Sequence, residues 1–177
     1  MLTEVTPGAA VGGFAQTVGM SDSETLSHPV YTVQVVIDSA DPHPLADWWA
    51  EALGWQVEPQ DEEFIRSMID QGFATEADTS THDGALVWAT AAAIHHPEGL
   101  DRAPRILFEQ VPEPKTVKNR VHLDLRNAAE PSFAERDRLV ALGAREVGGG
   151  TEGPTVAWVV LTDPEGNELC LPVPPGG

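Results

Sequence analysis

The chain has 177 residues, of which 41% are hydrophobic and 21% are charged, proportions typical of a globular protein. It carries 28 acidic against 10 basic side chains, a formal net charge of −18, which repels polyanions and argues against nucleic acid and anionic membranes as partners. No uncharged apolar run approaches the roughly 20 residues that cross a bilayer, so no membrane segment is expected. The single cysteine, Cys170, excludes an intrachain disulfide and favours a cytoplasmic location.

The N-terminal segment lacks the features of a folded element. The first nineteen residues contain no Lys or Arg and no continuous apolar stretch, so we expect no secretory signal, and Met20 is an alternative start. The residues that follow are rich in Ser, Asp and Glu. We therefore expect residues 1–28 to form a mobile tail.

The first ordered elements are predicted by their periodicity and punctuation. Residues 33–38 are β-branched and apolar enough for a strand, and Asp41 followed by Pro42 is typical of a helix start. A buried helical stripe then ends at Gly54, and a short strand follows from Trp55. The stripe has the spacing i, i+3, i+4, i+7, i+8 and consists of Leu45, Trp48, Trp49, Ala52 and Leu53.

The same order of signals recurs in the second half of the chain. Residues 121–126 again predict a strand, Pro131 again opens a helix, and Gly143 again ends it. His122 follows Gln34 by 88 positions. Pro131 follows Pro42 by 89 positions, and Gly143 follows Gly54 by 89 positions. The agreement indicates a duplicated βαβββ unit.

Further short strands complete each unit. In the second unit they are expected over residues 144–147, 155–161 and 168–171, separated by a glycine turn at 148–150 and by the turn 163–167. In the first unit they are expected over residues 55–58, 85–90 and 105–111, with a helical insertion at about 59–83. Module one therefore spans residues 29–112 and module two residues 119–173, within a single domain over residues 29–173.

These signals resemble the vicinal-oxygen-chelate superfamily, which includes glyoxalases, bleomycin-resistance proteins and extradiol dioxygenases. The most specific part is the run Asp-Pro-Glu-Gly-Asn from Asp163 to Asn167, and the connector Lys115 to Arg120 is similar to the glyoxalase-like subgroup. The resemblance implies an α+β fold in which two tandem βαβββ modules form an open, curved, mixed sheet around a cleft. The helices would lie on its outside.

The resemblance also implies a set of metal-ligand positions on the first and last strands of each module. They fall on Gln34, Glu109, His122 and Cys170. A divalent ion such as zinc or nickel would act there as a Lewis acid, with Glu109 as the carboxylate that moves a proton. Cys170 stands where the glyoxalase arrangement has a carboxylate, and buried cysteine more often packs as a small hydrophobe.

Two functions follow from these positions. The first is a metal-dependent lyase or isomerase acting on a substrate with vicinal oxygens; the alternative is a metal-free protein that binds or sequesters a small molecule, as bleomycin-resistance relatives do. We expect Asp124, Trp88 and Trp158 to contact the ligand. Superfamily members commonly dimerise, so a homodimer is compatible with the resemblance. His43 and His82 stand alone beside turn residues and receive no role.

Overall fold

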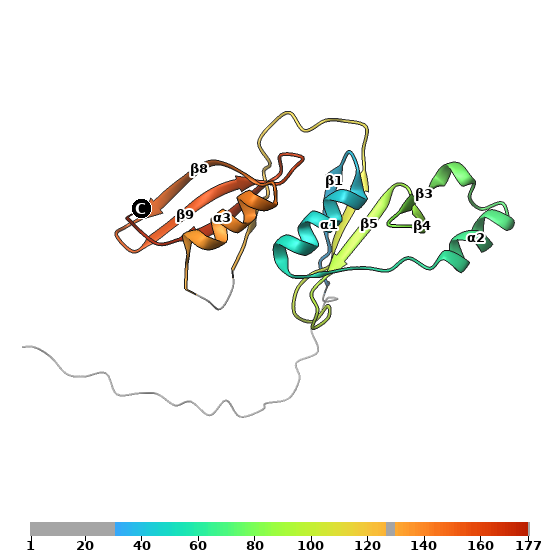
Figure 1. The fold of residues 1–177 in the computed structure, drawn as a ribbon, viewed down its shortest axis with the longest axis horizontal. Helices are drawn as coiled ribbons and strands as arrows, with labels where there is room; N and C mark the ends of the chain where they lie inside the picture. The colour runs from blue at the N-terminus through green and yellow to red at the C-terminus, as the bar shows by residue number, and fades with distance from the viewer. Residues whose placement is uncertain (1–30, 127–129, 177) are drawn as a thin grey trace, which may run out of the picture. The chain divides into compact units, whose positions relative to one another are not determined.

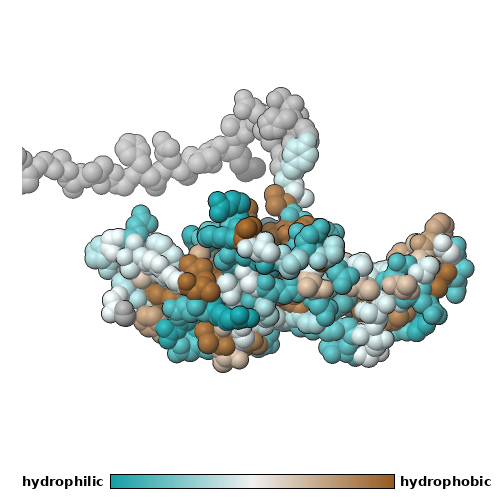
Figure 2. Space-filling view, turned by 90° about the horizontal axis from the view of Figure 1, so that it is seen from above, coloured by the Kyte–Doolittle hydropathy of each residue, from teal (hydrophilic) through white to brown (hydrophobic). Residues whose placement is uncertain are grey.

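The computed structural model describes residues 31–126 and 130–176, so the tail expected over residues 1–28 lies outside the described residues. The described part contains helices and several separate β-sheets, which confirms the predicted α+β class (Figure 1). None of its helices is long and apolar enough to cross a bilayer. Figure 2 shows polar residues over much of the visible face, with smaller apolar areas among them.

Module one is a four-stranded sheet with one long helix. Its elements are β1 (Val35–Ser39), α1 (Pro42–Leu53), β2 (Gln56–Val57), β5 (Ala91–His95) and β6 (Ile106–Gln110). The strand order is β1-β6-β5-β2, in which β1 and β6 run parallel and the other pairs run antiparallel.

Module two repeats this plan. Its elements are β7 (Leu123–Asp124), α3 (Phe133–Leu142), β8 (Arg145–Glu152), β9 (Val156–Thr162) and β10 (Glu168–Val173). The order β7-β10-β9-β8 matches that of module one strand for strand, including the parallel pairing of the first and last strands. Each module thus has the predicted βαβββ order.

The insertion of module one extends to Trp88, beyond the expected end at about residue 83. It contains α2 (Glu62–Asp70), a 3₁₀ turn (Glu76–Asp78) and the hairpin of β3 (Thr79–His82) with β4 (Ala85–Trp88). The hairpin forms its own two-stranded sheet, so the prediction that residues 85–90 join the main sheet is wrong.

The hairpin turn explains this difference. Asp83 and Gly84 both have positive φ, 49° and 82°, as two-residue hairpin turns require. This turn pairs β4 with β3, and the place in the main sheet falls to β5. The sequence of β5 begins with three alanines, residues of low strand propensity, so its strand was not predicted.

The two main helices begin and end at clear signals. Pro42 stands in the first turn of α1, and Gly54 ends the helix with a φ of 67°. The second helix, α3, begins at Phe133 and not at Pro131, because Ser132 is its N-cap and accepts a hydrogen bond from the Ala134 amide at 3.1 Å.

At the C-terminal ends of α1 and α3, a side chain of each helix donates a hydrogen bond to a backbone carbonyl of the other helix. The Trp48 indole donates to the Leu142 carbonyl at 3.1 Å, and Arg138 donates to the Ala52 carbonyl at 2.7 Å. Because the last carbonyls of a helix have no partner within it, these two bonds join the modules at positions where each helix needs donors.

Strand alternation places the core on one face of each sheet. On β9 the buried residues are Ala157, Val159 and Leu161, and on β10 they are Leu169, Leu171 and Val173. They belong to one apolar cluster with residues of α1 and α3. The opposite face of the module-two sheet is therefore free of the core.

The most buried ionisable group in the described core is Asp163, at the start of the Asp-Pro-Glu-Gly-Asn turn. One carboxylate oxygen accepts from the Glu165 and Asn167 amides at 3.0 and 2.8 Å. The other accepts from the Asn167 side chain at 2.9 Å and from the Trp49 indole of α1 at 3.0 Å. Four donors therefore offset the cost of burying this charge.

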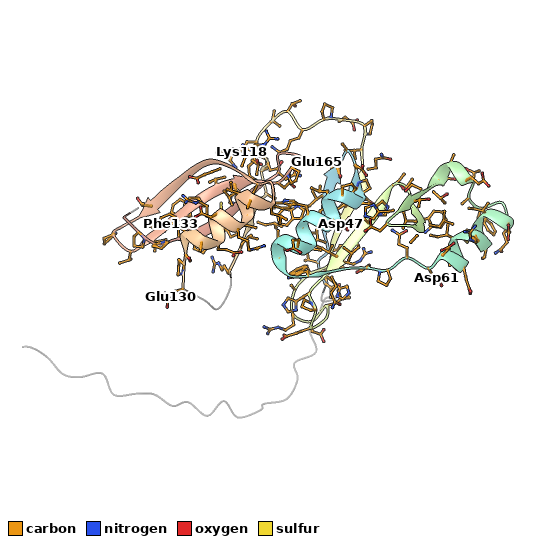
Figure 3. All side chains as sticks on the ribbon, in the orientation of Figure 1. Asp47, Asp61, Lys118, Glu130, Phe133 and Glu165 are labelled. Atoms are coloured by element: carbon orange, nitrogen blue, oxygen red, sulfur yellow. The ribbon has the colours of Figure 1, made fainter. Side chains whose placement is uncertain are left out.

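The same turn also holds the start of α1. One oxygen of Glu165 accepts from the Ser39 hydroxyl and the Asp41 amide, and the other accepts from the Ala40 amide, at 2.8 to 3.1 Å (Figure 3). A carboxylate at a helix N-terminus is favoured by the helix dipole. One turn of module two thus binds α1 of module one at two places.

We predict that Asp163→Asn lowers the free energy of unfolding by about 2–4 kcal/mol. The substitution keeps the shape of the side chain but puts an amide N–H against the Trp49 and Asn167 donors. Urea unfolding measures the loss, and Asp137→Asn, an exposed change on α3, is the control with an expected effect below about 0.5 kcal/mol. Equal stability of the two variants would contradict the role given to Asp163.

Candidate functional site

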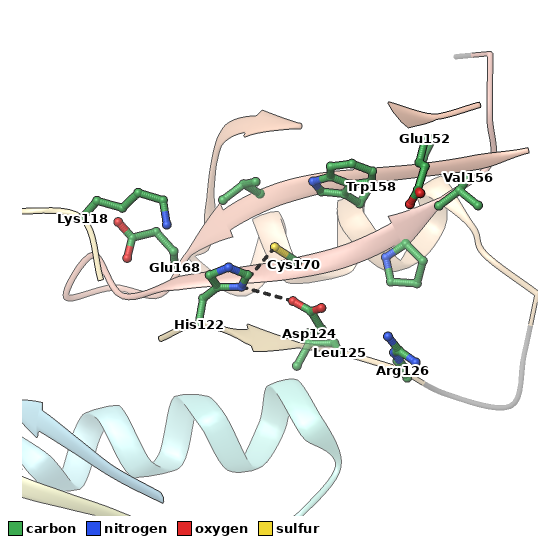
Figure 4. A pocket seen from close by; sticks show the side chains of 13 residues that line it. Lys118, His122, Asp124, Leu125, Arg126, Glu152, Val156, Trp158, Glu168 and Cys170 are labelled. Atoms are coloured by element: carbon green, nitrogen blue, oxygen red, sulfur yellow. Dashed lines mark hydrogen bonds and ion pairs between the residues drawn. The ribbon is translucent and has the colours of Figure 1, made fainter. Parts of the chain in front are cut away.

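A cavity of about 500 Å³ lies on the face of the module-two sheet that is free of the core (Figure 4). Alternation puts Trp158 and Val160 of β9, and Cys170 and Pro172 of β10, on this face. All the residues that line the cavity belong to the connector or to module two.

A glycine run makes room for the largest wall of the cavity. The prediction of a turn at residues 148–150 is wrong, because all three glycines lie within β8 and pair with β9. A Cβ atom added to Gly150 would lie 2.5 Å from Cζ2 of the Trp158 indole, so only glycine lets the ring lie against this strand. Trp158, predicted to contact the ligand, lines the cavity.

Three side chains with ligating atoms converge beside Trp158. Nδ1 of His122 lies 3.2 Å from Oδ1 of Asp124 and 3.6 Å from Sγ of Cys170. Their ligating atoms all lie within 4.8 Å of one another. The convergence follows from the register, because Cys170 on β10 pairs with Asp124 on β7.

The environment keeps the Cys170 thiol protonated. Partial burial, followed by the charge of Asp124 and a hydrogen bond with it, raises the pKa of Cys170, and the more distant Lys118 opposes this only partly. Asp124 and Cys170 both face Nδ1 of His122. A nucleophilic relay needs the two ring nitrogens to serve different partners, so the arrangement is not that of a cysteine nucleophile.

Charged residues lie at the edges of the cavity. Lys118 comes from the connector, Arg126 follows β7, and Glu152 ends β8. Sequence reasoning did not predict Arg126 or Glu152 as lining residues, because their positions depend on how the ends of the sheet are folded. It favoured a solvated connector for the basic run that contains Lys118, with attraction of an anionic substrate as the alternative. Lys118 and Arg126 supply positive charge beside the carboxylates of Asp124 and Glu152.

The connector is attached to the sheet through Glu168. One carboxylate oxygen of Glu168 accepts from Lys115 Nζ at 3.1 Å, and the other accepts from the Asn119 amide at 3.1 Å. Burial alone would raise the pKa of Glu168, but the hydrogen bonds from Asn119 and Lys115 outweigh it and hold the pKa below its usual value. These bonds position the segment that carries Lys118 and leads to His122.

In module one the two predicted ligands do not converge. Gln34 accepts a hydrogen bond from Arg105 at 2.9 Å, and Arg105 is also paired with Glu58 at 2.7 Å. Glu109 pairs in register with Asp38 of β1. Asp38 is four residues after Gln34, which corresponds to about 13 Å along an extended chain. The structure thus holds Gln34 in a polar contact and leaves Glu109 exposed beside a second carboxylate.

The strand registers show why the two modules differ at this place. The parallel pair of Asp38 with Glu109 corresponds to the pair of Asp124 with Cys170. Two residues before Asp124 stands His122, whereas two residues before Asp38 stands the exposed Val36. Module one therefore has no imidazole at the equivalent position.

Trp88, also predicted to contact the ligand, lies outside the residues that line the cavity. It ends β4 of the insertion, and its backbone amide donates to Oε1 of Gln60 at 2.7 Å. Its carbonyl is bonded to His43 Nε2 at 2.9 Å. Of the two predicted tryptophans, only Trp158 meets the cavity described here.

The donor set of His122, Asp124 and Cys170 fits a divalent ion of the zinc type. Imidazole nitrogen, carboxylate oxygen and thiolate sulfur are its usual ligands, and three protein ligands leave a position for a substrate. Because the ion binds thiolate, binding must displace the proton that the surroundings hold on Cys170. The three donor groups are therefore suitable ligands for such an ion, but binding of the ion costs the free energy needed to remove the proton from Cys170.

The sequence profile of the glyoxalase-like domain family matches residues 34–172. This range covers most of the chain, from the start of module one to the last strand of module two. The chain therefore belongs to the glyoxalase-like domain family. No curated protein matches the sequence.

Solved structures similar to this chain include a hypothetical protein from S. aureus, with a TM-score of 0.50 at 13% identity, covering 82% of this chain and 95% of that one. A glyoxalase/bleomycin resistance protein/dioxygenase family enzyme from Burkholderia phytofirmans PsJN has a TM-score of 0.46 at 14% identity, with coverage of 79% and 95%. A bleomycin resistance determinant encoded on the transposon Tn5 has a TM-score of 0.44 at 16% identity, with coverage of 82% and 98%. At such identities the likeness concerns the fold alone.

We predict that Gly150→Ala lowers the free energy of unfolding by about 1–3 kcal/mol, because the added methyl group overlaps the Trp158 indole. Gly148→Ala is the matched control, since a Cβ there meets nothing within 4 Å. In a Trp158→Ala background the cost of Gly150→Ala should fall to that of the control, as urea unfolding of the double-mutant cycle will measure. A cost unchanged by removal of the indole would show that the glycine serves another purpose.

We predict that Cys170 reacts slowly with iodoacetamide near neutral pH, because its raised pKa keeps the thiolate fraction small. Asp124→Asn should lower the pKa of the thiol and speed alkylation, about tenfold for each unit of decrease. Lys118→Gln should act in the opposite direction. The measurement is the alkylation rate as a function of pH, and it reports on Cys170 alone because the chain has one cysteine. Faster alkylation of the Lys118→Gln variant than of the unsubstituted protein would contradict this account.

Proposed function

We propose, starting from this family membership, that the protein binds a small organic molecule in the module-two cavity. A flat apolar part of the ligand would lie against the Trp158 indole, and a polar end would meet His122 and Asp124. The observation that carries the proposal is the glycine strand that gives Trp158 its place on an otherwise exposed sheet face. Binding sites for small molecules combine such apolar walls with a few fixed polar groups.

The apolar part of the cavity supports a ligand with a ring or other flat body. Val156, Val160 and Pro172 continue the surface around Trp158. His122, Asp124 and Cys170 lie on one side of the indole, and Glu152 and Arg126 lie on the other side, near Val156 (Figure 4). A ligand that covers this surface removes apolar area from water, worth about 25 cal/mol per Å² before the cost of association. The polar groups then favour molecules that carry donors and acceptors around the edge of their flat part.

The state of the Cys170 thiol favours binding without a metal. Its proton is held by burial and by Asp124, and Asp124 is itself bonded to His122. In this state the three side chains form a small hydrogen-bonding group that can contact a carbonyl or hydroxyl of the ligand. The function is then recognition or sequestration, without a chemical step.

A second candidate is a metal-dependent lyase or isomerase, favoured by the convergence of His122, Asp124 and Cys170 within 4.8 Å. These residues would hold a zinc- or nickel-like ion, which when bound supplies Lewis acidity for neighbouring substrate oxygens. Glu109 would be the carboxylate that moves the proton. The expected four-ligand set, which consists of Gln34, Glu109, His122 and Cys170, would need residues from both modules. A homodimer and a cytoplasmic location belong to the same expectation.

A thermal-shift experiment separates these functions. The probes are a panel of planar aromatic compounds, bleomycin, and separately Zn²⁺ and Ni²⁺. We expect at least one organic probe to raise the melting temperature of the metal-free protein by about 5 °C at saturation. Trp158→Ala should abolish this shift, whereas Trp88→Ala, a change outside the cavity, should preserve it.

The outcomes assign the function. A shift that survives Trp158→Ala, or that is lost only in Trp88→Ala, would overturn the assignment to the module-two cavity. Stabilisation by organic probes only after Zn²⁺ or Ni²⁺ has bound, with loss of the effect of the organic probe in His122→Ala, would establish the metal-dependent candidate in its place. Folding of each variant is checked beforehand by circular dichroism.

A further inference from the structure

A second group of ligating side chains lies in module one, where the inserted hairpin meets α1. His82 ends β3, Asp83 forms the hairpin turn, and Asp47 stands on α1. Nε2 of His82 lies 2.6 Å from Oδ2 of Asp47 and 3.9 Å from Oδ2 of Asp83. The ligating atoms of the three residues all lie within 4.8 Å of one another, although 35 residues separate the helix from the hairpin position.

The imidazole in this group is held in place from one side. The buried His43, one helical turn before Asp47, stacks on His82 with ring centroids 5.0 Å apart. His43 is itself fixed by a bond from Nε2 to the Trp88 carbonyl on the neighbouring strand at 2.9 Å. Stacking on His43 therefore helps to position the His82 ring and the hairpin against α1, in addition to the contact of His82 with Asp47.

The charges of the group are not balanced. In the described part of the chain, the ion pairs of Asp47 and Asp83 within 4 Å are both with His82, so two carboxylates share one imidazole. A Lys or Arg partner would neutralise them, but the basic residues that form ion pairs in the described residues serve other acids. The chain as a whole has a formal charge of −18, which concentrates cations near such a place.

We propose that Asp47, His82 and Asp83 form a binding site for a divalent cation of the zinc or nickel type. One imidazole nitrogen and two carboxylate oxygens are ligands that such ions accept, and water would complete the coordination. An ion bound through Nε2 requires the tautomer of His82 that carries its proton on Nδ1. The ion takes the place of the hydrogen bond and adds Asp83 to the contact.

The consequence of this site is a metal clamp between the insertion and module one. Because two ligands come from the hairpin and one from α1, the ion stabilises only the folded arrangement in which the hairpin lies against the helix. The site is independent of the cavity in module two and of the function proposed for it. Its ligand is the ion itself.

The test follows the imidazole rings of the full-length protein by long-range ¹H–¹⁵N spectra during titration with Zn²⁺. We expect the Nε2 resonance of His82 to shift on binding, and the melting temperature to rise by about 5 °C at saturation. A His122→Ala/Cys170→Ser background removes two ligands of the other candidate site. In this background the shift at His82 should persist.

Three variants identify the ligands. His82→Gln keeps a donor for Asp47 and so preserves the hairpin contact, but it should weaken Zn²⁺ binding at least about tenfold. Asp83→Asn should do the same, whereas Asp137→Asn removes one carboxylate on α3 and should leave binding unchanged. The site is overturned if His82 does not respond to millimolar Zn²⁺, or if His82→Gln binds Zn²⁺ as tightly as the background does.

Discussion

The arrangement of α1 against module two depends on the hydrogen bonds of the Asp163 carboxylate. It is fully buried, and its four hydrogen bonds include one to Trp49 of α1. A charge in this position is tolerated only while all its donors are present, so the turn from Asp163 to Asn167 and the helix of module one must be formed together. The turn also leads directly into β10, which carries Cys170. The constraint that joins the modules therefore helps to fix one wall of the cavity.

The duplicated fold is consistent with a candidate binding cavity on the sheet of module two. Both sheets have the same strand order, and in both the first strand runs parallel to the last. The side chains on the free faces differ, however: module two has His122 and Trp158, and module one has Val36 and a pair of carboxylates, Asp38 and Glu109, in register. Duplication of the backbone supplies two equivalent surfaces, and the side chains make only one of them a candidate binding surface.

Much of the fold could be predicted from the sequence, because its signals are local. The Asp41 and Pro42 start, the glycine stops and the turn from Asp163 to Asn167 are set by residues close together in the chain. Alternation predicted the last two strands of module two but missed β5. It also could not place Gly150 under Trp158, since that contact depends on cross-strand register. The same limit hid the hairpin of residues 79–88, where a local turn took a segment from the main sheet.

The site was predicted less well than the fold for the same reason. His122 and Cys170 were named from a family pattern, and they do lie together, but Asp124 joins them as a possible ligand and not only as a ligand-binding residue. His82 received no role because its partner Asp47 is distant in sequence. A histidine beside a turn carries no local signal of the helix on which it will pack, so only the tertiary structure reveals the group.

The central claim is that small molecules are recognised by the free face of module two. Chemical-shift mapping of the ¹⁵N-labelled protein with a library of aromatic fragments tests it most directly, because the mapping needs no knowledge of the natural ligand. The account predicts shifts centred on the Trp158 indole and on the amides of residues 122–126 and 168–171. Shifts centred instead on Gln34, Asp38 and Glu109 would contradict it and would place recognition on module one.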